Sequence, residues 1–146
     1  MTIHILVGTT SGNTEFLAEN LQSKLAGLGH ETQFHDQPDS TEVPMQNACW
    51  LLCVATHGAG EYAESILDFM DALNAQRPDL SSVRCAIVSV GDSSYDTFCQ
   101  AGIDAQQLLE SLNVQLIGKR LDIDMMVDLD PEATANAWID KISDQF

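Results

Sequence analysis

Two apolar runs constrain the fold of this chain more than any other feature. Cys49–Ala55 is apolar throughout, and Val83–Val90 is nearly so. A strand with one solvated face alternates apolar and polar residues, so these runs predict central strands that are covered on both faces. Strands of that kind belong to parallel sheets that carry helices on both sides.

Shorter strands and helices alternate along the rest of the chain. Leu17, Leu21, Leu25 and Leu28 recur on one face of a predicted helix, and Gly29 follows where a C-terminal glycine is expected. Ile66, Phe69, Met70 and Leu73 mark a second helix, residues 103–112 a third, and Asp130-Pro131-Glu132 starts a fourth that buries Trp138, Ile139 and Ile142.

The alternation predicts an α/β fold with five strands, at residues 3–8, 31–35, 49–55, 83–90 and 114–123. The usual strand orders of doubly wound sheets are 3-2-1-4-5-6 and 2-1-3-4-5, and the second has the right number of strands. In both orders, ligands bind at the carboxyl ends of the strands where the order reverses. The segments that follow the first, third and fourth strands are therefore the candidate site.

Composition narrows the class of protein further. The 146 residues suit one domain, residues 1–146, and the formal charge of −16 disfavours nucleic acid and anionic membranes as partners. A partner with a basic surface fits better.

We find no signal peptide and no apolar stretch of about 18 residues, so we expect a soluble, cytoplasmic protein. The four cysteines make no CxxC pair and no zinc-ligand spacing, which predicts reduced, mostly buried thiols.

The segment after the first strand, Gly8-Thr9-Thr10-Ser11-Gly12-Asn13-Thr14, runs into a helix. Backbone N–H groups and the helix dipole make such a turn an anion site, and its hydroxyl and amide side chains add donors. No Lys or Arg lies between residues 1 and 23, so a P-loop for nucleoside triphosphates is excluded, and G-x-G-x-x-G is missing too. The turn suits one phosphate monoester; the alternative is a helix cap without a ligand.

Two more polar segments follow the central strands. Ala55-Thr56-His57-Gly58-Ala59-Gly60-Glu61-Tyr62 contains two glycines, which predict a loop that lies against a flat ligand or changes conformation. Gly91-Asp92-Ser93-Ser94-Tyr95-Asp96-Thr97-Phe98-Cys99 carries two aromatic residues. We expect Tyr95 to stack on a planar ligand and Phe98 to belong to the core or to take a partial role.

The three segments together resemble the flavodoxin family. The first is similar to the flavodoxin phosphate signature, the second to the T-x-G-x-G-(E/D) loop of diflavin reductases, and the third to the flavodoxin ring loop. The match covers the whole chain and is nearest to short-chain flavodoxins of the MioC type, followed by the YqcA type. His57 departs from the Trp or Tyr that often flanks the flavin in this family.

The resemblance implies an FMN-binding electron carrier rather than an enzyme. Thr9, Thr10, Ser11, Gly12, Asn13 and Thr14 would hold the phosphate; Thr56, His57, Gly58, Ala59 and Gly60, with Gly91, Asp92, Tyr95, Phe98 and Cys99, would enclose the ring; no catalytic or metal-binding residues are expected. The implied partners are an NADPH-dependent flavodoxin reductase and an acceptor enzyme such as biotin synthase. We expect a monomer.

Acidic residues gather in and beside these segments: Glu61, Glu64, Asp92, Asp96, Asp122 and Asp124. Their charges would disfavour an anionic reduced flavin and attract a basic redox partner. Two alternatives stay open: a binding or regulatory module with weak FMN affinity, for which the departure at His57 argues, and a flavin-dependent quinone or nitro reductase.

Overall fold

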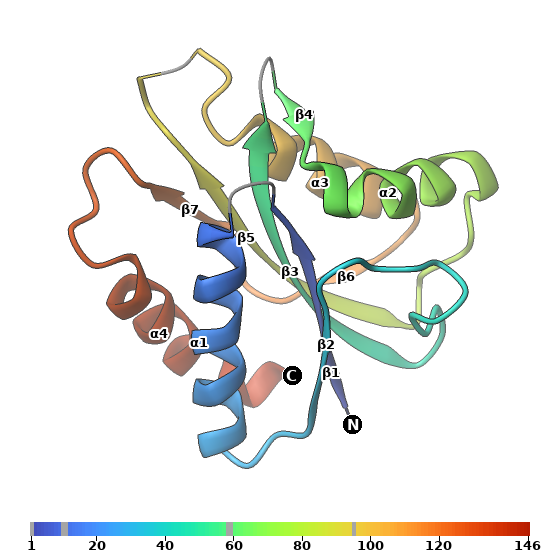
Figure 1. Cartoon of the computed structure of the whole chain (residues 1–146). Helices are drawn as coiled ribbons and strands as arrows, with labels where there is room; N and C mark the ends of the chain where they lie inside the picture. Colours follow the sequence, from blue (N-terminus) through green and yellow to red (C-terminus); the bar gives the residue numbers. More distant parts are fainter. Residues whose placement is uncertain (1, 10–11, 58–59, 95) are drawn as a thin grey trace.

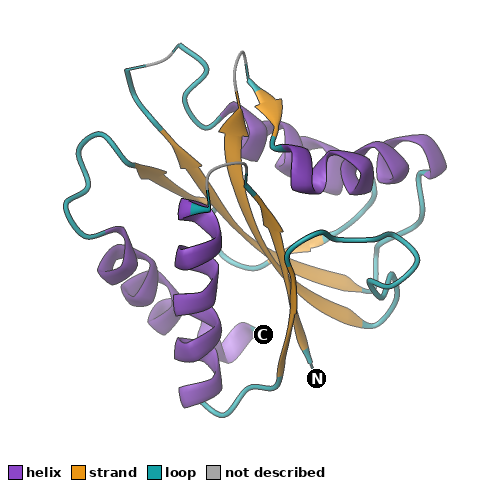
Figure 2. Ribbon diagram, in the orientation of Figure 1, coloured by secondary structure: helices purple, strands orange, loops and turns teal. Residues whose placement is uncertain are grey.

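One twisted sheet forms the centre of the molecule (Figures 1 and 2). The computed structural model describes residues 2–9, 12–57, 60–94 and 96–146. The strands are β1 (Ile3–Gly8), β2 (Thr32–His35), β3 (Ala48–His57), β4 (Glu61–Tyr62), β5 (Val83–Gly91), β6 (Gln115–Leu116) and β7 (Leu121–Asp124). The helices are α1 (Asn13–Gly27), α2 (Glu64–Gln76), α3 (Gln100–Ser111), α4 (Pro131–Ile142) and the short 3₁₀ helix η1 (Ser143–Gln145).

The main path of the sheet runs β2-β1-β3-β5-β6, and every pair on it is parallel. The path agrees with the predicted order 2-1-3-4-5, but the prediction of five strands is wrong in two respects. A short strand, β4, pairs antiparallel with the end of β3. The predicted last strand is also divided, because β6 and β7 both pair with β5 and residues 117–120 lie between them.

The division of the last strand has a local cause. Cys85 pairs with Leu116 and Val88 with Leu121, so two residues of β5 lie opposite four residues of the partner segment. The surplus residues leave the sheet in a bend that contains Gly118, whose φ of +64° favours glycine. Arg120 lies in this interruption, and its contacts with β7 and α3 are described below.

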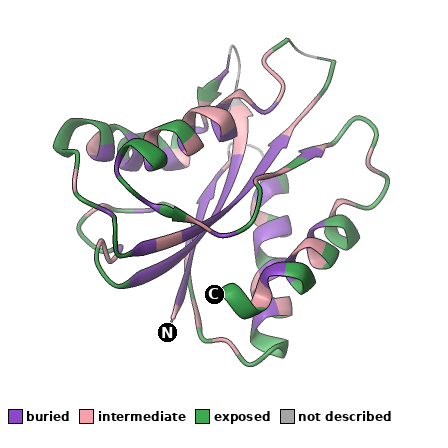
Figure 3. Cartoon of the chain, turned by 180° about the vertical axis from the view of Figure 1, so that it is seen from behind, coloured by how far each residue is buried: buried purple, intermediate pink, exposed green. Residues whose placement is uncertain are grey.

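Helices cover both faces of the sheet, α1 and α4 on one and α2 and α3 on the other (Figure 3). Side chains of α1 and α4 pack with the odd-numbered residues of β1 in one core, whereas side chains of α2 and α3 pack with Leu6, Trp50 and Leu52 in the other. β3 is buried from Ala48 to Val54, which confirms the prediction that this run is covered on both faces.

The structure confirms two helix ends that the sequence predicted, the C-terminal end of α1 and the N-terminal end of α4. The N–H groups of Gly29 and His30 donate to the carbonyls of Ala26 and Leu25, which is the Schellman pattern, and Gly29 has a φ of +92°. Asp130 caps α4, since its carboxylate accepts a hydrogen bond from the N–H of Ala133 at 3.1 Å.

The buried thiols are also as predicted: Cys49, Cys53, Cys85 and Cys99 are free and buried. Ile139 and Ile142 of α4 are buried, whereas Trp138 is only partly buried and donates from its indole N–H to the carbonyl of Lys119. None of the described helices combines the length and the apolar character that crossing a bilayer requires.

A pair of buried histidines joins β1 to the edge strand β2. Nδ1 of His4 and Nε2 of His35 lie 3.0 Å apart, and each residue is 7% exposed. Burial lowers the pKa of both imidazoles, and the proximity of His35 lowers that of His4 further. The folded protein therefore favours uncharged rings at these two positions.

This pair should make the fold less stable in mild acid. Below about pH 6.5 the unfolded chain binds protons that the folded histidines resist, so the free energy of unfolding falls as pH falls, by up to about 1.4 kcal/mol per pH unit for each histidine. Urea unfolding between about pH 7.5 and 5.5 measures the slope. The double variant His4→Leu/His35→Leu should flatten it, whereas Gln33→Ala, at an exposed position of β2, should not. Equal slopes in all three proteins would contradict this role.

Candidate cofactor site

The carboxyl ends of β1, β3 and β5 lie side by side at one edge of the sheet. The chain passes from β1 to β2 on one side and returns to β3 on the other, so the strand order reverses between β1 and β3. Ligands of doubly wound sheets bind at this position. The structure thus brings the starts of all three predicted segments together, as the sequence indicated.

The first segment turns sharply from β1 into α1. Gly12, the N-cap of α1, has a φ of +85° and no side chain with which to cap the helix. The N–H of Gly12 donates to Oγ1 of Thr9 at 3.1 Å, and the N–H of Phe16 donates to the carbonyl of Gly12. Thr14 is buried at 2% exposure. Thr10 and Ser11 lie outside the described residues.

This turn fits a phosphate group. The first turn of a 15-residue helix presents backbone N–H donors and the positive end of the helix dipole, and its N-cap residue, Gly12, has no side chain that could accept from them. A Cβ built at Gly12 would meet none of the described residues within 4 Å, so these residues leave space beside the backbone at the helix start. Donors and space together are what binding an anion at a helix N-terminus requires.

Ser65, in the first turn of α2, supports the turn between β1 and α1 through two hydrogen bonds. The sequence analysis missed this residue. Its Oγ accepts a hydrogen bond from the N–H of Thr9 at 2.9 Å and donates to the carbonyl of Val7 at 3.2 Å. A serine at the second position of a helix looks like an ordinary capping residue, and nothing in its spacing indicates the end of β1 as its partner.

We expect Ser65→Ala to destabilise the protein and to weaken phosphate binding. The variant leaves the N–H of Thr9 without its partner, which costs about 1–3 kcal/mol for a partly buried group. Denaturant unfolding measures the loss, and Ser23→Ala, at an exposed position of α1, is the control. If the two variants unfold alike, the contact does not support the turn.

The second segment is less of a loop than the sequence suggested. β3 continues through Thr56 and His57, which pair with Tyr62 and Glu61 of β4. Oγ1 of Thr56 accepts a hydrogen bond from the N–H of Ala101 at 3.1 Å, so its hydroxyl also anchors the start of α3. Gly60 has a φ of +107°, which favours glycine. Gly58 and Ala59 lie outside the described residues.

The third segment packs tightly against the end of β5. A Cβ on Gly91 would lie 2.8 Å from the backbone nitrogen of Cys99 and 2.9 Å from Phe98, so only glycine fits. Phe98 is half-buried, and the thiol of Cys99 is buried and directed at the carbonyl of Ser89. Burial raises the pKa of this thiol. Tyr95 lies outside the described residues.

Aspartates shape this segment through hydrogen bonds. Oδ1 of Asp92 accepts from the N–H and the hydroxyl of Ser94, at 2.8 and 2.6 Å. Oδ1 of Asp124, at the end of β7, accepts from the N–H of Ser93 at 3.1 Å. The hydrogen bonds from Ser93 lower the pKa of Asp124, so this carboxylate is ionised at neutral pH.

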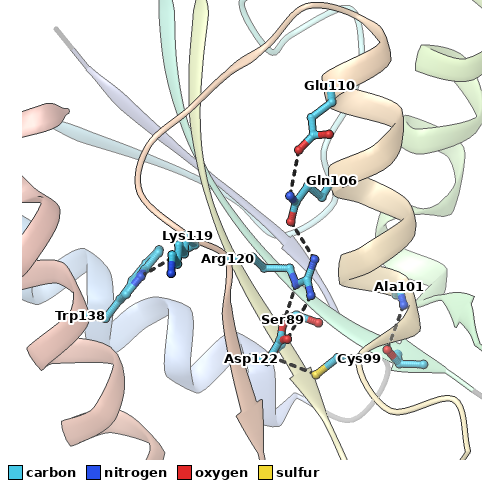
Figure 4. A network of polar contacts seen from close by, with 10 residues as sticks. Ser89, Cys99, Ala101, Gln106, Glu110, Lys119, Arg120, Asp122 and Trp138 are labelled. Atoms are coloured by element: carbon cyan, nitrogen blue, oxygen red, sulfur yellow. Dashed lines mark hydrogen bonds and ion pairs between the residues drawn. The ribbon is translucent and has the colours of Figure 1, made fainter.

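One of the acidic residues that the sequence singled out is neutralised. Asp122 forms a two-pronged ion pair with Arg120, at 2.7 and 3.1 Å (Figure 4). The same guanidinium donates to Oε1 of Gln106 on α3 at 2.7 Å. Arg120 therefore joins β7 to α3, and Asp122 adds little net charge to this edge of the sheet.

Comparison with known proteins identifies the family. The model of the flavodoxin family matches residues 5–138. The chain belongs to the flavodoxin family. It is 34% identical over 144 residues to a MioC homologue of Pasteurella multocida, which covers 99% of this chain and 97% of the relative. It is therefore a short-chain flavodoxin of the MioC type.

One further relative and one solved structure are similar to nearly the whole chain. The sulfite reductase [NADPH] flavoprotein alpha-component of Bacillus subtilis is 33% identical over 142 residues, 96% of this chain and 23% of that protein. A C101A mutant of flavodoxin from Pseudomonas aeruginosa has the same fold, with a TM-score of 0.88 at 27% identity over 97% of this chain and 95% of that one. FMN is the cofactor of this family, and the phosphate cradle fits it.

Proposed function

We propose that this flavodoxin is a cytoplasmic FMN-dependent electron carrier between an NADPH-dependent reductase and acceptor oxidoreductases. The observation that carries the proposal is the start of α1, where the N-cap is a glycine, at the point where the strand order reverses. The turn has no lysine or arginine and suits a single phosphate group. It therefore favours FMN over nucleoside triphosphates, whose binding loops contain a lysine. FMN, when bound, supplies the redox chemistry, and the protein binds and orients it.

The roles of individual residues follow from their positions. We assign the phosphate to residues 9–14 and the ring to the space between residues 56–60 and 91–99. Gly91 lets the third segment pack directly on β5, and the pairing of β3 with β4 fixes the base of the second segment. The whole chain, residues 1–146, would act as one domain, and the buried free thiols suit a reducing compartment.

Reduction by a purified flavodoxin reductase tests the proposal. The protein is loaded with FMN, NADPH and reductase are added, and the flavin absorbance is followed. Bleaching that requires the reductase supports a carrier. Oxidation of NADPH without the reductase would instead support an enzyme, and failure to retain FMN would support a binding module with weak affinity. Transfer from the reduced protein to biotin synthase tests the acceptor that the resemblance suggests.

The net charge of −16 should make this reaction sensitive to salt. A basic partner is attracted at low ionic strength, and raising the salt from about 0.02 to 0.5 M shortens the range of that attraction. We expect the second-order rate constant to fall by about tenfold or more. Reduction by dithionite, a small anion, is the control and should become faster with salt. A reductase rate that does not fall would contradict electrostatic steering.

A further inference from the structure

The turn between β7 and α4 exposes an unusual concentration of large apolar side chains. Met125, Met126, Val127 and Leu129 are 42, 62, 69 and 100% exposed. They are four of the seven large apolar residues that are exposed in the described part of the chain. We call Met125–Leu129 the apolar turn. Clusters of this kind on a folded domain mark sites of interaction.

A hollow separates the apolar turn from α1 and extends the exposed surface. It has a volume of about 350 Å³ and is lined by Asn13, Phe16 and Leu17 of α1, by Val90 of β5, and by Met125 and Leu129 of the turn. Phe16 is itself 67% exposed. The apolar turn and Phe16 line the same hollow and together form one surface beside the start of α1.

Hydrogen bonds hold the apolar turn in shape. Oδ1 of Asp124 accepts from the N–H of Met126 at 3.0 Å, and its carbonyl accepts from Val127 and Asp128. The carboxylate of Asp128 accepts from the N–H of Asp130 at 2.9 Å and from Oγ1 of Thr134 at 2.8 Å. A surface that is already ordered loses little conformational entropy when a partner binds.

The apolar turn is also hydrogen-bonded to the candidate cofactor site. The N–H of Met125 donates to the carbonyl of Gly91 at 2.8 Å, and the N–H of Ser93 donates to Asp124 at 3.1 Å. Asn13, in the hollow, is the first residue of α1 and belongs to the predicted phosphate cradle. A protein seated on this surface would therefore contact segments adjoining the cofactor.

The charge around the surface selects the chemistry of its partner. Between residues 121 and 140 there is no lysine or arginine, and four carboxylates lie in or beside the apolar turn: Asp124, Asp128, Asp130 and Glu132. Asp130 and Glu132 also line the hollow, whereas Asp122 and Asp140 are paired with Arg120 and Lys24. An apolar patch within a ring of negative charge complements an apolar patch within a ring of Lys and Arg side chains. The same carboxylates repel an anionic membrane and a second copy of this chain.

We propose that the apolar turn and Phe16 form the surface on which the electron-donating reductase docks. The inference rests on the proposed function as an electron carrier. The apolar side chains supply the desolvated centre of the contact, and the surrounding carboxylates orient the partner. The partner's face is apolar at its centre and basic at its margin.

Steady-state kinetics of the FMN-loaded protein with purified NADPH-dependent flavodoxin reductase test the proposal. The variant Met126→Gln/Val127→Thr/Leu129→Gln removes the apolar character at exposed positions, and Leu28→Gln, at the opposite end of α1, is the control. We expect the triple variant to raise KM for the carrier about tenfold or more, since each lost apolar contact weakens docking. The kcat, the FMN affinity and the unfolding midpoint should stay as in the unchanged protein.

Each of three other outcomes would overturn the proposal. If the reductase reduces the unchanged protein and the triple variant with equal KM, the docking surface is wrong and the proposed function stands. If the reductase does not reduce the unchanged protein, the proposed function fails and this inference fails with it. If sedimentation shows a dimer that the triple variant abolishes, the surface binds a second copy and the assignment to the reductase is overturned.

Discussion

Replacing Gly102 with alanine should destabilise this protein by about 1–3 kcal/mol or more, a large part of the roughly 5–15 kcal/mol that stabilises a typical domain. Gly102 lies in the first turn of α3 against β5. A Cβ at this position would lie 2.2 Å from Oγ and 2.3 Å from Cβ of Ser89. Ser89 is fully buried in a central strand, so the helix or the strand must move to make room.

A second helical glycine provides the control. Gly27 is the last residue of α1, and a Cβ there would meet no described residue within 4 Å. Gly27→Ala should therefore leave the stability unchanged or raise it by up to about 1 kcal/mol, because alanine loses less conformational entropy in a helix. Urea unfolding of both variants measures the difference.

The steric cause can be separated from a loss of flexibility. The double variant Gly102→Ala/Ser89→Gly lacks the side-chain atoms that clash with the new methyl group. It should therefore lose less stability than the two single variants lose when their losses are added. Equal stabilities of Gly102→Ala and Gly27→Ala would contradict the close approach of α3 to β5.

Asn13→Asp should weaken FMN binding at least about tenfold while the fold stays intact. Asparagine and aspartate have the same shape, but the new carboxylate stands at the start of α1, where the phosphate is expected. At about 5 Å from a phosphate dianion, the repulsion is about 1.7–6.6 kcal/mol for dielectric constants from about 80 to 20.

The effect on stability should have the opposite sign. A carboxylate in the first turn of a helix interacts favourably with the helix dipole, by about 0.3–1 kcal/mol. Fluorescence titration with FMN and urea unfolding of the apoprotein measure the two effects separately. Gln107→Glu, at an exposed position on α3, changes the net charge equally and should not alter FMN affinity. An unchanged affinity in Asn13→Asp would place the phosphate elsewhere.

Structural features were predictable from the sequence where they depend on one residue or on a short run of neighbouring residues. Gly29 and Asp130 were predictable as helix ends because the left-handed turn and the side-chain cap each depend on one residue. The run at Cys49–Ala55 was predictable as a central strand because burial on both faces removes alternation. The three segments at the sheet edge follow from the same reasoning, since parallel strands end together.

What could not be predicted depends on partners far away in the sequence. β4 has only two residues, too few for any periodicity, and exists because it pairs with Thr56 and His57. Ser65 acts on Thr9 and Val7, which are more than fifty positions earlier. The break between β6 and β7 did leave a signal, because Gly118-Lys119-Arg120 interrupts the apolar run of the last strand.

Titration of the apoprotein with FMN and with riboflavin tests the central claim most directly. Riboflavin has the same ring and lacks the phosphate. If the turn at residues 9–14 holds a phosphate monoester at the start of α1, FMN will bind one to one and riboflavin at least about tenfold more weakly, since charge-assisted hydrogen bonds are lost. Equal affinities for the two flavins, or no saturable binding of FMN, would contradict the account.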